Sequence, residues 1–169
     1  MIVLRQWRPE DAPGLARAAN SEGVAYNLRE GFPQPYTEEN ARAFIAACRE
    51  CEGRTNIERA IEADGKIAGT VGIRLKAQKP GEAVTGELGY WLDKDCRGKG
   101  VMTFAVENIC RQAFEEYGVA EITAEVFERN RASVRVLEKN GFSFSGEVFC
   151  RKDGEMLRVL RFSLLRTGL

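Results

Sequence analysis

Apolar and polar residues alternate along several short stretches of this 169-residue chain, and apolar residues recur every three to four positions along others. The first pattern is typical of half-buried strands, and the second is typical of amphipathic helices. We therefore predict strands over residues 2–8, 56–63, 66–75, 86–93, 121–127, 142–151 and 154–164. We predict helices over residues 9–20, 37–51, 102–117 and 130–139.

Two Asp-Gly pairs, at residues 64–65 and 153–154, each separate two predicted strands. Asp-Gly is a strong signal for a tight β-hairpin, because both residues tolerate the positive φ angles of that turn. Residues 27–36 contain one glycine and two prolines, so they are predicted to form an irregular loop. Residues 77–85 are predicted to form a turn-rich connection.

The order of these elements defines the fold class. Strands that follow one another directly are expected to pair antiparallel, whereas the strand-helix-strand segment over residues 86–127 implies one parallel pair. The chain is therefore expected to form one α/β domain over residues 1–169. Its sheet is expected to be mixed, mostly antiparallel and seven-stranded, with four flanking helices.

Charge and hydropathy exclude some classes of partner. Lysine plus arginine and aspartate plus glutamate number 25 each, so there is no electrostatic case for binding nucleic acid or an anionic membrane. The N-terminal residues lack the pattern of a signal peptide, and no apolar stretch approaches the ~18 residues of a membrane span. We expect a cytoplasmic protein.

The sequence contains no histidine, which excludes Ser-His-Asp and Cys-His catalysis. Five scattered cysteines argue against a disulfide framework. Cys48 and Cys51 form a C-x-x-C, but no second pair completes a four-ligand metal site, so they are expected to pack in a helix. We predict no metal.

The strongest chemical signal is a glycine-rich turn between a strand and an amphipathic helix. It reads Arg97-Gly98-Lys99-Gly100-Val101-Met102. Glycines let the backbone approach a ligand, and the free amides and dipole of a helix N-terminus attract anions. The turn therefore predicts a phosphate or pyrophosphate site, although it could also serve only to start the helix. Neither the P-loop nor the Rossmann pattern fits it.

This turn resembles the pyrophosphate loop of the GNAT superfamily of acetyl-CoA-dependent N-acetyltransferases, [Q/R]-x-x-G-x-[G/A]. It departs from that pattern only in its last residue, Met102. The G-x-M-T sequence after a G-Y-W-L strand, and the N-x-x-S…E-K-x-G-F stretch over residues 130–142, resemble the RimJ/RimL branch. The resemblance implies the GNAT fold, acetyl-CoA as co-substrate and an amine as acceptor.

The resemblance also implies that different segments of the chain bind different parts of acetyl-CoA. Backbone groups of Trp91, Leu92 and Asp93 would pair with the pantetheine arm as an added strand. The amides of residues 97–102 would hold the pyrophosphate. Asn130 and Ser133 would face the thioester, although Asn130 could equally be a helix N-cap and Ser133 an ordinary first-turn serine.

The family mechanism is direct attack of the amine on the thioester in a ternary complex, without an acyl-enzyme. Glu87, on the strand that leads to the turn, is our candidate for the general base, and an exposed strand glutamate is the alternative. Many relatives protonate the leaving thiolate with a tyrosine, but that position is Leu137 here. Ser133 is our substitute candidate.

Recognition of the acceptor is expected in the loop over residues 27–36, because loops on a rigid scaffold often carry specificity. Phe32 and Tyr36 would flank the amine, and Arg29 or Glu30 would read its charge; packing of the two aromatic rings under the loop is the alternative. A protein N-terminal α-amine, a small amine, an amino sugar and a polyamine all stay open as acceptors.

Three further alternatives stay open. The chain could be a non-catalytic acyl-CoA sensor of the same fold or an unrelated nucleotide-phosphate-binding protein. A homodimer could also form through pairing of the last strand, which carries Leu160, Phe162 and Leu164.

Overall fold

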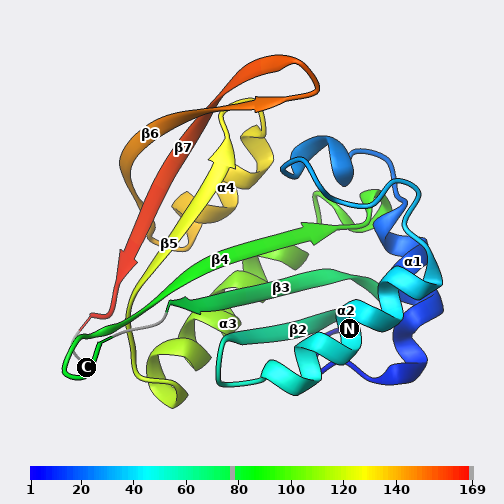
Figure 1. The fold of residues 1–169 in the computed structure, drawn as a ribbon, viewed down its shortest axis with the longest axis horizontal. Helices are drawn as coiled ribbons and strands as arrows, with labels where there is room; N and C mark the ends of the chain where they lie inside the picture. Colours follow the sequence, from blue (N-terminus) through cyan, green and yellow to red (C-terminus); the bar gives the residue numbers. More distant parts are fainter. Residues whose placement is uncertain (77–78, 168–169) are drawn as a thin grey trace.

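The computed structural model describes residues 1–76 and 79–167 (Figure 1). Residues 77 and 78 of the predicted connection and residues 168 and 169 lie outside this description. The strands are β1 (Ile2–Arg5), β2 (Asn56–Ala63), β3 (Lys66–Lys76), β4 (Val84–Leu92), β5 (Val119–Phe127), β6 (Ser143–Lys152) and β7 (Glu155–Leu165). The helices are α1 (Ala12–Ala19), α2 (Glu38–Cys51), α3 (Val101–Glu116) and α4 (Arg131–Lys139), with 3-10 turns at Pro9–Asp11, Ala25–Asn27 and Lys94–Cys96.

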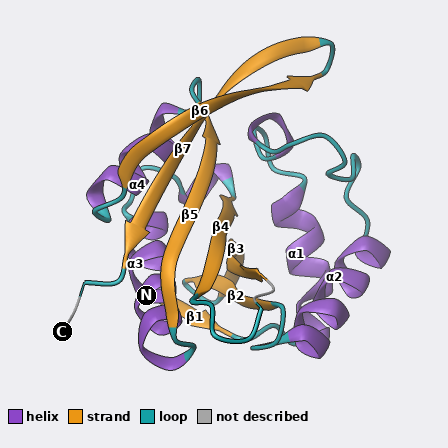
Figure 2. Cartoon of the chain, turned by 60° about the vertical axis from the view of Figure 1, so that its left-hand side comes forward, coloured by secondary structure: helices purple, strands orange, loops and turns teal. Residues whose placement is uncertain are grey.

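The seven strands form one sheet in the order β1-β2-β3-β4-β5-β7-β6. Among the strands of the described residues, only the neighbours β4 and β5 pair in parallel, and the other neighbours are antiparallel. Helices α1 and α2 cover one face, and α3 and α4 cover the other (Figure 2). The predicted fold class is confirmed, including the single parallel pair.

The last strand does not offer a free edge. Strand β7 pairs with β5 on one side and with β6 on the other. Leu160 and Phe162 are buried in the core. The prediction that β7 could pair across a homodimer is therefore wrong, because its backbone groups are used within the sheet.

The predicted hairpins and helix starts follow the local chemistry. Asp64 and Asp153 both have positive φ, as do the glycines that follow them, as the turns require. Thr37 caps α2 by accepting a hydrogen bond of 3.0 Å from the Asn40 amide. Helix α3 buries its apolar stripe against the sheet, and full burial of a side chain such as Ile109 contributes about 1.5–3 kcal/mol.

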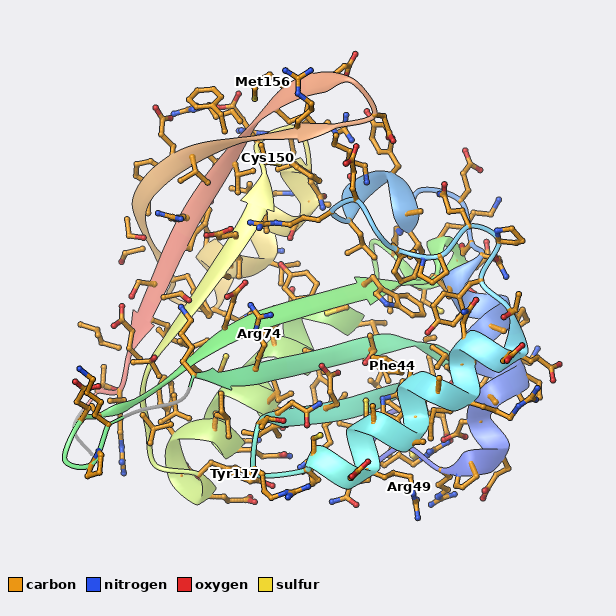
Figure 3. The ribbon with its side chains drawn as sticks, viewed as in Figure 1. Phe44, Arg49, Arg74, Tyr117, Cys150 and Met156 are labelled. Atoms are coloured by element: carbon orange, nitrogen blue, oxygen red, sulfur yellow. The ribbon has the colours of Figure 1, made fainter. Side chains whose placement is uncertain are left out.

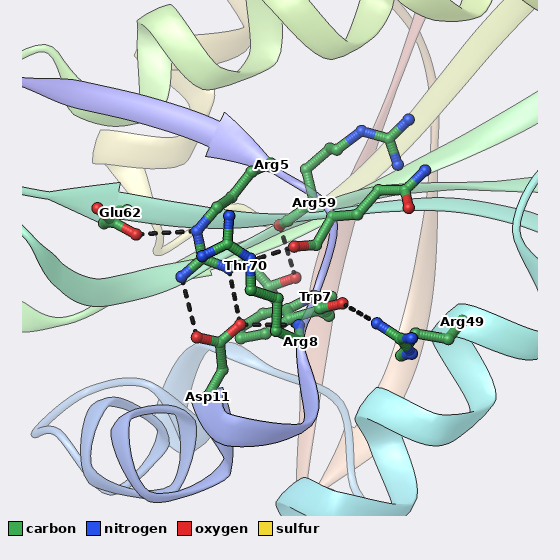
Figure 4. Close-up of polar contacts among 9 residues, drawn as sticks. Arg5, Trp7, Arg8, Asp11, Arg49, Arg59, Glu62 and Thr70 are labelled. Carbon is green, nitrogen blue, oxygen red and sulfur yellow. Dashed lines mark hydrogen bonds and ion pairs between the residues drawn. The ribbon is translucent and has the colours of Figure 1, made fainter.

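The N-terminal elements are shorter than predicted, because a buried ion pair bends the chain (Figure 4). The Asp11 carboxylate accepts hydrogen bonds of 2.7 and 2.9 Å from the Arg5 guanidinium and one of 2.8 Å from the Arg8 amide. Burial alone would raise the pKa of Asp11, but these hydrogen bonds lower it. Strand β1 therefore ends at Arg5, and the predicted helix begins with a 3-10 turn before α1.

The feature that positions the site is a divergence within the sheet. Strands β4 and β5 pair only as far as Leu88 and Ala124, and beyond that point they separate (Figure 1). The end of β4 keeps β3 on one side and has no strand on the other. We call this opening between the ends of β4 and β5 the gap.

Candidate active site

A cleft of about 330 Å³ lies where the gap meets the start of α3. Four segments contribute to it: the turn after α1, the end of β4, the glycine-rich turn with α3, and α4. Its lining residues are Gly23, Val24, Asn27, Leu28, Tyr90, Trp91, Leu92, Arg97, Gly98, Gly100, Val101, Met102, Thr103, Asn130, Ala132, Ser133, Arg135, Val136 and Lys139.

The glycine-rich turn presents backbone amides to this cleft. Gly98 and Gly100 adopt left-handed φ angles of 72° and 76°, and a Cβ at either position would meet open space. Gly100 is the N-cap of α3 and supplies no side-chain cap, so the amides of Val101 and Met102 have no partner within the helix. The glycines therefore provide both the backbone geometry and the room for an anion.

Arg97 has a different role from the predicted one. Its amide donates to the Lys94 carbonyl at 3.2 Å, which corrects the prediction that it is among the phosphate donors. Its guanidinium donates to the Leu92 carbonyl at 3.0 and 3.2 Å and to the Glu22 carbonyl at 3.0 Å. Arg97 thus fastens the end of β4 to the turn after α1.

Lys99 is exposed and does not line the cleft. Its ammonium donates to the Asp95 carbonyl at 2.7 Å, so the side chain folds back over the preceding 3-10 turn. Of the predicted donors, Arg97, Gly98, Gly100, Val101 and Met102 line the cleft, and Lys99 is the one that does not. The Arg97 amide is already used by the Lys94 carbonyl.

The hydrogen bonds of β4 show which of its peptide groups are free to pair with pantetheine, and these differ from the predicted ones. The Asp93 amide donates to the Ala68 carbonyl of the β3 side at 2.7 Å, so alternation directs the Trp91 peptide groups toward β3 as well. The peptide groups of Tyr90 and Leu92 face the gap instead. The sequence analysis did not include Tyr90 among the pantetheine contacts. Peptide groups of a strand alternate in direction, so the choice of Leu92 already implied Tyr90, two residues earlier.

The Asp93 side chain is structural. It accepts hydrogen bonds from Arg17 at 2.8 Å, from the Ser21 hydroxyl at 3.0 Å and from the Asp95 amide at 3.2 Å. Burial raises its pKa, but these bonds outweigh that effect and lower the pKa of Asp93 overall. Asp93 thereby holds α1 against the start of the glycine-rich turn.

At the start of α4, Asn130 and Ser133 both line the cleft. Asn130 caps the helix by accepting from the Ser133 amide at 3.3 Å. The Ser133 hydroxyl lies 2.5 Å from the Tyr90 hydroxyl, and burial raises the pKa of Tyr90 to about 12, against the lowering effect of this hydrogen bond. Leu137 is completely buried in the core, so the phenol beside Ser133 comes from β4 and not from α4.

Glu87 lies outside the lining of the cleft. Strand alternation places it with Gly89 and Trp91 on the face that α1 and α2 cover. Its carboxylate forms an ion pair of 3.0 Å with Arg74, which projects from β3 (Figure 3). The structure therefore places Glu87 beside the gap but gives its carboxylate a cationic partner.

Glu58 is a half-buried residue whose carboxyl group sequence reasoning missed. It extends from β2 across Gly72, where a Cβ would lie 2.0 Å from Glu58 Oε1. The Thr70 hydroxyl donates to Glu58 Oε2 at 3.1 Å. Burial raises the pKa of Glu58 to about 7, and the charge of Glu52 adds to the rise, whereas Thr70 and Arg59 oppose it.

The loop after α1 is held by the β6–β7 hairpin. The buried ammonium of Lys152 donates to the carbonyls of Ala25 and Leu28, and the Glu30 carboxylate accepts from the Asp153 amide at 2.7 Å. Glu30 therefore anchors the loop and is not free to read the charge of an acceptor.

The other predicted acceptor residues, Arg29, Phe32 and Tyr36, line one cavity beside the cleft. Arg29 forms an ion pair with Glu125 of β5. Phe32 stacks on Tyr36 with ring centroids 5.2 Å apart, and it meets the edge of Trp91 at 6.3 Å. Burial raises the pKa of Tyr36 to about 12.

Within the described residues, no three His, Cys, Asp or Glu side chains come together as a metal site. In the same part of the chain, no helix is long and apolar enough to span a bilayer.

Residues 2–143 match the family model described as "Acetyltransferase (GNAT) domain". The chain therefore belongs to the GNAT acetyltransferase family, a family of acyltransferases. The family predicted from the glycine-rich turn and the residue 130–142 stretch is confirmed.

Two relatives and one solved structure illustrate the similarity. "Probable N-acetyltransferase YjcK" of Bacillus subtilis is 42% identical over 83 residues, which cover 49% of this chain and 45% of YjcK, less than half of its length. "Uncharacterized N-acetyltransferase p20" of Bacillus licheniformis is 28% identical over 98% of this chain and 93% of its own. Mycobacterium smegmatis RimJ, solved in complex with CoA-disulfide, shares the fold with a TM-score of 0.86 at 21% identity, covering 97% of this chain and 81% of RimJ.

Proposed function

We propose that this protein transfers the acetyl group of acetyl-CoA to a primary amine by direct attack of the amine on the thioester. The observation that carries the proposal is the pair of amides at Val101 and Met102 that have no partner within α3 and follow two left-handed glycines at the mouth of the gap. A CoA-bound structure of RimJ, which has the same fold, supports this cofactor.

The amides of Gly98, Gly100, Val101 and Met102 would bind the diphosphate, since a helix N-terminus favours anions. The pantetheine arm would lie in the gap and pair with the Tyr90 and Leu92 peptide groups, as an added strand does. The Leu92 carbonyl is already taken by Arg97, so the Leu92 amide and both Tyr90 groups would serve. Asn130 and Ser133 would then lie near the thioester.

Transfer requires a neutral amine, because the free pair of electrons attacks the carbonyl carbon. Alkyl amines have pKa values of about 10.4 and protein α-amines of about 8, so a base must take a proton. Glu87 would accept it through water, from its place on the same face as Gly89. An amide that faces the gap, from Tyr90 or Leu92, would stabilise the oxyanion.

As the tetrahedral intermediate collapses, the carbon–sulfur bond breaks and a thiolate leaves. Ser133 would donate its proton to that thiolate, and the Tyr90 phenol 2.5 Å away would replace it. Solvent would then return a proton to Tyr90 and take up the one that Glu87 accepted from the amine. General-acid catalysis contributes only modestly to this step, because the pKa of the leaving thiol is about 8.5. The products are CoA and the N-acetylated amine.

Membership in the acetyltransferase family removes the alternative of an unrelated nucleotide-phosphate binder. A turnover assay distinguishes the proposed enzyme from a non-catalytic acyl-CoA sensor. We expect CoA thiol release from acetyl-CoA that depends on added amine, with the acetylated amine detected by mass spectrometry. Binding of acetyl-CoA without amine-dependent thiol release, across small amines and N-terminal peptides, would contradict the proposal and favour the sensor.

A further inference from the structure

A second cavity, of about 540 Å³, lies beside the cleft. It is enclosed by the loop after α1, by α2 and by the end of β4. Its lining residues are Leu15, Leu28, Arg29, Gly31, Phe32, Pro33, Tyr36, Asn40, Ala43, Phe44 and Trp91. Leu28 and Trp91 line both the cleft and this cavity, so the two adjoin.

The walls of this cavity are mainly apolar and aromatic. The Phe32 ring contacts the rings of both Tyr36 and Trp91. Phe44, on α2 (Figure 3), lines the same cavity, and its ring centroid lies 5.9 Å from that of Trp7. The remaining apolar wall is aliphatic. Such a cavity favours an aliphatic or aromatic group, whose burial removes apolar surface from water.

Two polar side chains in the wall, Asn40 and Arg29, already have partners. The Asn40 side-chain oxygen accepts hydrogen bonds from the Thr37 amide and hydroxyl at 2.9 and 2.8 Å. Arg29 is paired with Glu125. None of the residues that line the cavity is a carboxylate. A cationic group placed there would lose water, gain no counter-ion and meet the positive charge of Arg29.

We propose that this cavity binds an apolar side chain carried by the acceptor next to its amino group. The acceptor class is therefore a primary amine with a large aliphatic or aromatic neighbour, such as an N-terminal residue with an apolar side chain. Polyamines and amino sugars are excluded, because both would place cationic or hydroxylated groups against these walls. This inference rests on the proposed function, since it assumes that the amine reacts in the adjoining cleft.

The first test compares amino-acid amides, which share one α-amine and differ in their side chain. We expect kcat/KM for phenylalaninamide and leucinamide to exceed that for glycinamide and serinamide at least tenfold, mainly through KM, with spermidine the poorest. Equal rates for all of these amines would overturn the inference and leave the acetyltransferase assignment intact.

A matched pair of variants tests the cavity itself. Ala43→Phe adds a ring to the cavity wall from an exposed position of α2, and should remove the preference for phenylalaninamide. Ala47→Phe adds the same ring one turn later, where the residue is also exposed but does not line the cavity. It should keep the preference. Loss of the preference in both variants, or in neither, would contradict the assignment.

A binding test needs no turnover and separates this inference from the proposed function. In the presence of CoA, N-acetylphenylalaninamide should bind at least tenfold more tightly than N-acetylglycinamide, measured by tryptophan fluorescence, and Ala43→Phe should abolish the difference. Equal binding would overturn the cavity assignment. Selective binding without any amine-dependent thiol release would keep the cavity and contradict the proposed acetyl transfer.

Discussion

The hydroxyl groups of Tyr90 and Ser133 lie 2.5 Å apart, on two elements that face each other across the cleft. Tyr90 comes from β4 and Ser133 from the first turn of α4. The pair supplies a buried phenol where the family's usual tyrosine position is occupied by Leu137. In the proposed mechanism, the two hydroxyls act as one proton-donating unit.

Tyr90→Phe is expected to lower kcat roughly tenfold, because Ser133 then loses the group that would restore its proton. Ser133→Ala should lower kcat to a similar extent. The double variant should be no slower than the slower single variant, since the two groups act together. Steady-state thiol release measures all three rates, and multiplicative losses in the double variant would show that the hydroxyls act independently.

Glu87→Gln is expected to lower kcat at neutral pH, with little change in acetyl-CoA affinity, because the base is lost and the cofactor contacts are not. Arg74→Gln is the matched control, since it breaks the same 3.0 Å ion pair from the other side. It should keep most of the rate. If both variants lose the same activity, the ion pair matters and Glu87 is not the base.

Glu58→Gln is expected to change the pH dependence of stability. Because burial raises the pKa of Glu58 to about 7, the folded state binds more protons than the unfolded state between about pH 4.5 and pH 7. Stability contributed by the protonated carboxyl is present below this window and is lost as pH rises through it, by roughly 3 kcal/mol in all. The variant should lack this loss.

Urea unfolding at pH 5 and pH 8 tests this expectation, because the free energy of unfolding of the wild type should fall more steeply with pH than that of Glu58→Gln. Besides burial, the groups that act on the pKa of Glu58 are Thr70, Glu52 and Arg59. Parallel pH profiles for the two proteins would show that Glu58 ionises normally.

Periodicity and turn chemistry were enough to predict the sheet class, because they depend on neighbours along the chain. The Asp64 and Asp153 turns, the Thr37 cap and the parallel β4–β5 pair all follow from local signals. The bend after Arg5 does not follow from local signals, because it depends on an ion pair between Asp11 and the guanidinium of Arg5, which lies on another element.

The same limit applies to the site. The glycines of the turn were found because their conformation is a local property. The hydrogen bond from the Arg97 guanidinium to the Leu92 carbonyl depends on tertiary structure, and so does the contact between the Tyr90 and Ser133 hydroxyls. Such contacts between separate elements cannot be predicted from local signals. Strand alternation predicts that the peptide groups of Tyr90 and Leu92 face the same way. Only the observed pairing with β3 shows that this direction is toward the gap.

The central claim is that the amides after Gly98 and Gly100 bind the diphosphate of acetyl-CoA, and calorimetric titration of two glycine variants tests it most directly. Gly100→Glu places a negative charge at the anion site, whereas Gly118→Glu adds the same side chain at the other end of α3, where φ is also positive and the space also open. We expect Gly100→Glu to weaken acetyl-CoA binding at least about 100-fold and Gly118→Glu to bind as the wild type does. Equal, wild-type affinity in both variants would contradict the account.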